Sequence, residues 1–255
     1  MTSRDGTRIA FDQSGEGPAI ILVVGAFNDR ATAAPLAQSL KQYFTVFNYD
    51  RRGRGDSDDT APYAVERELE DLDALIAQAG GSACVFGYSS GAILALRAAA
   101  HGLAISRLTF YEPPPTGARA GDLAPQLTEL IVAGRRGDAV ELFQTEAVGI
   151  PAAVVAQMRN APFRPSLEKI AHTLVYESTI LRSLPTGLTA SVQAPTFVID
   201  GEQSPGVMRQ AAKALAAALP NGQYHTLQGH GHDIDPAVLA PVLAEFLLTQ
   251  KKQTR

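Results

Sequence analysis

The sequence contains little cysteine and no marked excess of basic charge. Among its 255 residues Cys84 is the single cysteine, which excludes an internal disulfide framework, and its apolar neighbours predict a buried thiol. The formal net charge is −4, and we interpret the terminal Lys251, Lys252 and Arg255 as a solvated tail. This charge distribution is not typical of a nucleic-acid-binding surface.

Long hydrophobic runs are also missing. No run reaches the ~18 apolar residues that a bilayer-spanning helix needs, and the polar residues 1–18 do not resemble a signal peptide. We therefore expect a cytoplasmic protein without a membrane partner. Hydrophobic residues make up 45% of the chain, which allows the large core of an α/β domain.

Short apolar runs bounded by turn residues alternate with stretches of helical periodicity. The runs predict buried strands at 19–24, 45–50, 83–88, 108–111 and 196–200, with a last strand around 223–227. The periodic stretches predict helices at 32–42, 65–79, 90–101, 207–219 and 236–248. This alternation indicates a mainly parallel sheet with helices on both faces, and residues 7–18 fit an antiparallel edge strand and a turn.

One segment interrupts the alternation. Between 113 and 190 only helical patterns occur, at 122–133, 138–146, 151–159 and 165–177. We therefore expect a core formed by 1–112 and 191–255, with 113–190 as an all-helical cap over one end of the sheet.

The stretch GYSSG lies where the strand 83–88 ends and a helix begins. Ligands of open α/β sheets bind at such strand ends, and a sharp strand–turn–helix holds its turn residue in a strained conformation between close-packed glycines. Gly87 and Gly91 flank Ser89 at two residues on either side, whereas Ser90 has no such pair. Ser89 is therefore the candidate nucleophile.

A serine needs a general base to accept its proton, and the base needs an orienting carboxylate. Three of the five histidines have structural interpretations: His101 at a helix end, His172 in the helical segment and His225 inside the last strand. His230 and His232 lie in a loop between the last strand and the last helix. We favour His232 because the helix follows it sooner.

Several motifs in order resemble the α/β-hydrolase fold over nearly the whole chain. GYSSGA resembles that family's nucleophile elbow, and DRRGRGDSD at 50–58 resembles the turn after its fourth strand. The loop after ILVV resembles its oxyanion loop, and PVLAEFL at 241–247 its closing helix. We interpret Asp50, Arg51 and Arg52 as structural residues of that turn.

The oxyanion loop departs from the family in one respect. Where the family commonly has His-Gly, this chain has Val24-Gly25. Since the donor is a backbone N–H, the resemblance still implies Ala26 and Ser90 as oxyanion donors, with Phe27 as the other choice. The ring of Phe27 is expected to line the pocket, as is Tyr88.

The acid is the second departure. In the family's usual Asp position after the strand 196–200, this chain has Ser204. Zearalenone-type lactonases have a Glu-x-Pro after the strand next to the nucleophile's, which Glu112-Pro113-Pro114 resembles. We therefore favour Glu112 as the acid. The alternatives are Asp200, Glu202 and Asp233.

These residues predict a cofactor-free and metal-free serine hydrolase that acts on a small-molecule carboxylic ester or lactone (the EC 3.1.1 class). A C–C hydrolase or perhydrolase would use the same triad. A hydrolase-like ligand receptor is the alternative from another functional class. The natural substrate and the oligomeric state are not encoded in any pattern that we recognise.

Overall fold

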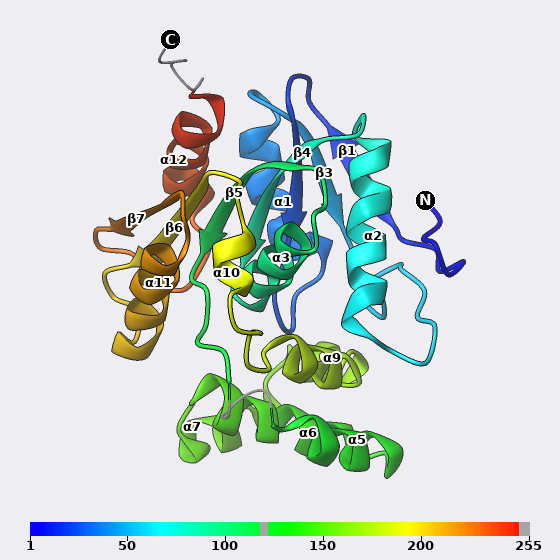
Figure 1. Ribbon diagram of the computed structural model, residues 1–255. Coiled ribbons are helices and arrows are strands. Elements are labelled where there is room, and N and C mark those ends of the chain that lie inside the picture. Colours follow the sequence, from blue (N-terminus) through cyan, green and yellow to red (C-terminus); the bar gives the residue numbers. More distant parts are fainter. Residues whose placement is uncertain (118–121, 250–255) are drawn as a thin grey trace.

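One seven-stranded sheet organises the protein, in the order β1-β3-β2-β4-β5-β6-β7 (Figure 1). The computed structural model describes residues 1–117 and 122–249, so the basic tail, Lys251, Lys252 and Arg255, lies outside the described residues. The strands are β1 Phe11–Ser14, β2 Ala19–Val23, β3 Thr45–Tyr49, β4 Ala83–Tyr88, β5 Ile105–Tyr111, β6 Thr196–Gly201 and β7 Gly222–Leu227. β1 pairs antiparallel with β3, and the other neighbours are parallel. The predicted fold class is therefore confirmed.

Helices cover both faces of the sheet. On one face lie α1 Arg30–Leu40 and α12 Pro236–Leu248; on the other lie α2 Val65–Gln78, α3 Ser90–Ala100 and α11 Gly206–Ala218. Because side chains alternate along a strand, Ile20 and Leu22 of β2 pack in the first layer, whereas Ile21 and Val23 pack in the second. Burial on both faces explains why the strands appear as continuous apolar runs.

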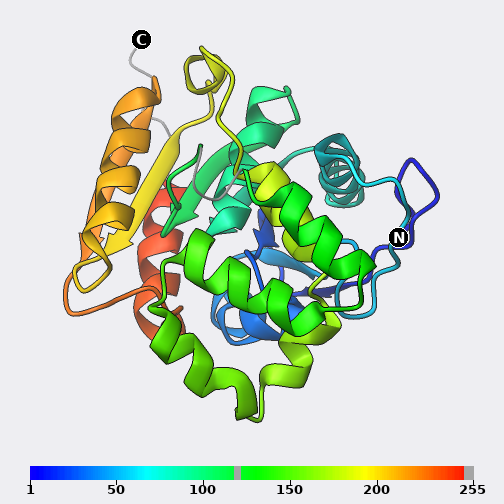
Figure 2. The same ribbon diagram turned by 90° about the horizontal axis from the view of Figure 1, so that it is seen from below.

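A group of helices connects β5 to β6, and we call residues 113–190 the helical segment. It comprises α5 Ala124–Val132, α6 Arg136–Leu142, a π-helix η1 Phe143–Val148, α7 Ala152–Gln157, a 3₁₀-helix η2 Met158–Asn160, α8 Arg164–Lys169 and α9 Thr173–Ile180, and α10 Leu188–Ser191 extends just past it. The segment's described residues contain no strand. Figures 1 and 2 show α5 to α9 gathered at one end of the sheet.

The expected single helix 165–177 is instead two helices, α8 and α9. The chain breaks at 170–172, which places the His172 ring between the core and the segment. Its Nε2 lies 3.4 Å from Asp59 Oδ2, and its Nδ1 lies 3.0 Å from a guanidinium nitrogen of Arg136. These polar contacts favour the break over a continuous helix.

Across the residues that the structure describes, no helix has both the length and the apolar character needed to cross a membrane.

Candidate active site

A sharp backbone turn joins β4 to α3. There Ser89 has φ 54° and ψ −129°, a conformation that L-residues rarely adopt. Close packing requires both flanking glycines: a Cβ on Gly87 would lie 2.5 Å from Ala92 Cα, and one on Gly91 would lie 2.3 Å from the Val23 carbonyl oxygen. The turn therefore has the tight geometry that the spacing of GYSSG predicts.

Glu112 follows β5 at the same edge of the sheet, with φ 55°. Its backbone N–H donates to the Ile199 carbonyl at 2.8 Å, which joins this turn to β6. The side chain is completely buried, and Oε1 accepts the Gly201 N–H at 2.6 Å. Oε2 lies 3.2 Å from His232 Nδ1. One carboxylate oxygen is thus anchored to the backbone, and the other faces the imidazole.

Tyr111 holds the loop that carries His232. Its hydroxyl donates to the Gly231 carbonyl at 2.6 Å and to the Asp233 carbonyl at 3.2 Å. Burial raises the pKa of Tyr111, so the hydroxyl keeps the proton that it donates. Asp233 contributes its carbonyl to this contact. The Tyr88 ring supports the imidazole from beneath, with 5.1 Å between the two ring centroids.

Among the described residues, the other histidines make contacts away from this carboxylate. His230 Nδ1 lies 3.9 Å from Asp235 Oδ2. The ring of His225 on β7 lies 5.9 Å from the ring of Phe197 on β6, and His172 contacts Asp59. The preference for His232 over His230 thus has a geometric basis in the contact with Glu112.

Two of the alternative acids, Asp200 and Glu202, accept hydrogen bonds from groups other than His232. Asp200 accepts the Tyr224 hydroxyl at 2.6 Å, and Glu202 accepts a backbone N–H of the loop after β7 at 3.0 Å. Within the described part of the chain, Glu112 is the carboxylate that contacts His232. No hydrogen bond there joins Ser89 to the imidazole. The His232 ring instead packs against Tyr88, the residue directly before Ser89.

The loop after β2 packs directly on this turn. A Cβ on Gly25 would lie 2.9 Å from Ser89 Cβ, so only glycine fits. Ala26 and Ser90, the expected oxyanion donors, are in contact, but the Ala26 N–H already donates to Ser90 Oγ at 2.9 Å. The Phe27 N–H, at φ 63°, has no partner among the described residues.

The two expected pocket residues have different environments. The Phe27 ring is partly exposed and packs edge-on against Phe143 of η1, with 5.6 Å between the centroids. Tyr88 departs from the expectation: it is 6% exposed, and its ring stacks on Tyr111 at 6.0 Å. Because Tyr88 supports His232 from within the core, it has little surface to offer a substrate.

The turn after β3 is held by buried ion pairs, in agreement with its structural interpretation. Asp50 accepts the backbone N–H groups of Arg30 at 2.8 Å and Asp56 at 2.9 Å. Arg52 makes a bidentate pair with Asp71, both distances being 2.8 Å. A surface hollow of about 720 Å³ lies close by, but none of the candidate catalytic residues lines it.

Sequence comparison identifies the family of the chain. Residues 20–242 match the Alpha/beta hydrolase family. The chain belongs to this family. Among solved structures, an alpha/beta hydrolase from Sphaerobacter thermophilus is 51% identical, with a TM-score of 0.90 over 97% of this chain and 99% of that one. An enol-lactonase from Burkholderia xenovorans, 22% identical over 96% and 98% of the two chains with a TM-score of 0.74, shares the fold.

Named relatives of this α/β hydrolase are hydrolases of several kinds. The pimeloyl-[acyl-carrier protein] methyl ester esterase of Xanthomonas campestris is 27% identical over 87% of this chain and 90% of its own length. N-formylmaleamate deformylase of Pseudomonas putida is 36% identical over 40% of each chain. The chain spans well under half the length of the curated relatives that it matches at more than 30% identity.

Proposed function

We propose that this α/β hydrolase is a serine hydrolase that cleaves a carboxylic ester or lactone through an acyl-enzyme. The observation that carries the proposal is the contact of 3.2 Å between Glu112 Oε2 and His232 Nδ1, beside the strained turn at Ser89. A proton on Nδ1 that faces the carboxylate leaves Nε2 free to accept a proton from a serine hydroxyl.

In the proposed reaction, Ser89 Oγ attacks the carbonyl carbon as His232 Nε2 accepts the hydroxyl proton. Glu112 stabilises the imidazolium that forms. The tetrahedral intermediate collapses as the imidazolium protonates the leaving alkoxide, which departs from an ester and stays tethered in a lactone. Water, deprotonated by the same histidine, then attacks the acyl-enzyme. The second tetrahedral intermediate collapses, and the imidazolium returns the proton to Ser89.

The negative oxygen of each intermediate requires two N–H donors. The Ser90 N–H begins α3, where a helix leaves its first N–H groups without partners and favours negative charge. The second donor is the Ala26 N–H, which must then share its proton between Ser90 Oγ and the oxyanion, or the neighbouring Phe27 N–H. Removing one such donor typically costs ~3–4 kcal/mol of transition-state stabilisation.

We further propose that the helical segment acts as the cap of this site. The Phe27–Phe143 contact supports this role, since it joins the loop beside Ser89 to η1 of the segment. An aromatic pair at the site is suited to an apolar acyl or ring portion of a substrate.

A fluorophosphonate probe tests the nucleophile. Wild-type protein should be labelled, and Ser89→Ala should not. Because Ser90→Ala keeps its backbone N–H, this variant should still be labelled, though more slowly. A folded wild-type protein that resists the probe would argue for the ligand-receptor alternative. Labelling that persists in Ser89→Ala would assign another nucleophile.

A turnover panel then narrows the substrate class. Short and long p-nitrophenyl esters, macrocyclic lactones and an N-formyl amide cover the bond types that the proposed acyl transfer and the named relatives suggest. Preference for lactones over linear esters of the same acyl length would favour lactonase activity.

A further inference from the structure

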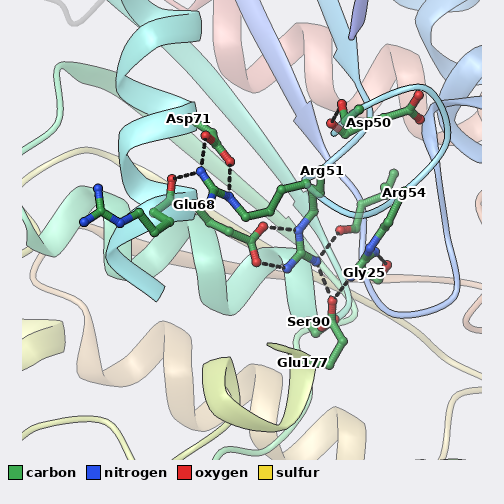
Figure 3. A network of polar contacts seen from close by, with 12 residues as sticks. Gly25, Asp50, Arg51, Arg54, Glu68, Asp71, Ser90 and Glu177 are labelled. Atoms are coloured by element: carbon green, nitrogen blue, oxygen red, sulfur yellow. Dashed lines mark hydrogen bonds and ion pairs between the residues drawn. The ribbon is translucent and has the colours of Figure 1, made fainter. Parts of the chain in front are cut away.

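A buried ionic network connects the helical segment to the loop beside Ser89 (Figure 3). Arg51 and Arg54 lie in the turn after β3 and are almost fully buried. Glu177 of α9, also fully buried, accepts hydrogen bonds from both of them: Oε1 lies 2.6 Å from Arg51 Nη1, and it also receives Arg54 Nη2. On its other side Arg51 pairs with Glu68 of α2 at 2.6 and 2.7 Å.

The same two guanidinium groups bind carbonyl oxygens of the loop. Arg51 donates to Val24 at 3.1 Å, while Arg54 donates to Gly25 at 2.5 Å and to Asn28 at 3.0 Å. In a planar trans peptide, the N–H points opposite to the carbonyl. Arg54, by holding the Gly25 carbonyl, therefore turns the N–H of the next residue away from itself and toward the serine turn.

The contact of that N–H confirms its direction. The Ala26 N–H donates to Ser90 Oγ at 2.9 Å, at the turn itself. Burial would raise the pKa of Glu177, but Arg51, Arg54 and a hydrogen bond with the Ser90 side chain together lower it. The carboxylate is therefore anionic, and it contacts the arginine that orients the peptide.

Arg54 depends on Glu177 for its charge balance. Burial and the nearby charge of Arg51 both lower the pKa of Arg54, and the Glu177 and Glu68 charges oppose them. Among the described residues, Glu177 is the carboxylate that Arg54 contacts. Without that partner, Arg54 would be a buried charge with carbonyl contacts alone.

We propose that Glu177 is a positioning residue for the oxyanion donors: through Arg54 it fixes the peptide between Gly25 and Ala26. The inference rests on the proposed function, since it assigns a role to this loop in acyl transfer. It also makes the donor geometry depend on α9, because the carboxylate comes from the helical segment and not from the core.

The test compares Glu177→Gln with Asp71→Asn. Both changes remove a buried carboxylate from an arginine of the same turn, but Arg52, the partner of Asp71, makes its hydrogen bonds to Asp71, Asp5 and the Arg67 carbonyl and none to residues 24–28. With a p-nitrophenyl ester, Glu177→Gln should lower kcat roughly 10²-fold with KM within about threefold, since oxyanion donors act mainly in the transition state. Its affinity for a trifluoromethyl ketone, whose adduct carries the oxyanion, should fall in the same proportion.

Asp71→Asn should lose thermal stability yet keep kcat and ketone affinity within about threefold. Equal losses of kcat in the two variants, in step with their lost stability, would show a merely structural role and overturn the proposal. If Glu177→Gln does not fold, Arg54→Lys replaces it, because one ammonium cannot reproduce the planar contacts to Glu177 and Gly25. A wild-type kcat in Arg54→Lys would also overturn the proposal.

Hydrogen–deuterium exchange gives a readout that needs no activity. Glu177→Gln, or Arg54→Lys in its place, should speed exchange in the peptide that covers 24–28 more than Asp71→Asn does. A wild-type protein without turnover or labelling would refute the proposed function, whereas unchanged exchange in this loop would refute the positioning role.

Discussion

Replacing Glu112 by Gln changes one oxygen of the buried carboxylate into an amide nitrogen with almost no change in volume. The Gly201 N–H donates to Oε1 at 2.6 Å, so the atom at this position must be an oxygen that can accept the hydrogen bond. If the amide turned its NH₂ toward this N–H, two buried donors would face each other, at a cost of ~1–3 kcal/mol. The glutamine must therefore present its NH₂ to His232.

In the native protein, His232 Nδ1 lies 3.2 Å from a carboxylate oxygen. An NH₂ group in place of that oxygen can only donate, so Nδ1 would have to accept the hydrogen bond. The imidazole proton then moves to Nε2, and that nitrogen can no longer accept the proton of Ser89. A wrong tautomer of this kind lowers kcat by ~10⁴, which corresponds to about 5 kcal/mol of transition-state stabilisation.

The assay is kcat and KM for a short p-nitrophenyl ester, with the thermal midpoint of each variant as a check on folding. Asp200→Asn and Glu202→Gln are the matched controls, since their carboxylates have partners other than His232. Both should stay within about tenfold of the wild-type kcat. A kcat within tenfold of wild type in Glu112→Gln would refute this assignment, as would an equal loss in either control.

Three further predictions concern individual residues. His232→Gln should lower kcat at least ~10⁴-fold, whereas His230→Gln should leave steady-state kinetics nearly unchanged because its ring faces Asp235. Ser89→Gly should be about 1 kcal/mol more stable to urea than Ser89→Ala, since glycine relieves the strain at φ 54°. Burial raises the pKa of Asp59, but hydrogen bonds from the helical segment bring it below 3.8. Asp59→Asn should therefore lower the free energy of unfolding above pH 3.8. Below that pH, the free energy of unfolding should fall less steeply in the variant than in the wild type, as measured by urea unfolding at pH 7 and pH 3.

Local patterns were sufficient to predict the sheet and the serine turn. Strands buried on both faces produce apolar runs that are visible without any partner. The serine turn is marked by the spacing of Gly87 and Gly91 around Ser89, which is visible in five consecutive residues, although the need for Gly91 comes from its packing on Val23 of β2. Glu112 could be proposed because it ends a recognisable strand at the same sheet edge. These features depend on a few consecutive residues, so the sequence contains their signal.

Contacts that depend on distant packing were not predictable in this way. Glu177 is 126 residues from Arg51, and its helix has no periodic feature that marks one buried acid as a partner of two arginines. The break between α8 and α9 likewise depends on where His172 meets the core. The position of Tyr88 next to Ser89 predicts a pocket residue, but alternation along β4 directs its ring into the core.

Backbone strain gives an independent argument for catalysis over simple ligand binding. Among the described residues, Phe27, Ser89 and Glu112 are the non-glycine residues with positive φ, and they lie on three separate loops at one edge of the sheet. Each such residue costs ~1–3 kcal/mol and persists only where its surroundings impose it. A receptor needs a pocket of suitable shape, which relaxed loops can provide. Strain at these three positions is better explained by the proposed acyl transfer, which needs a nucleophile, an acid and an oxyanion loop held together.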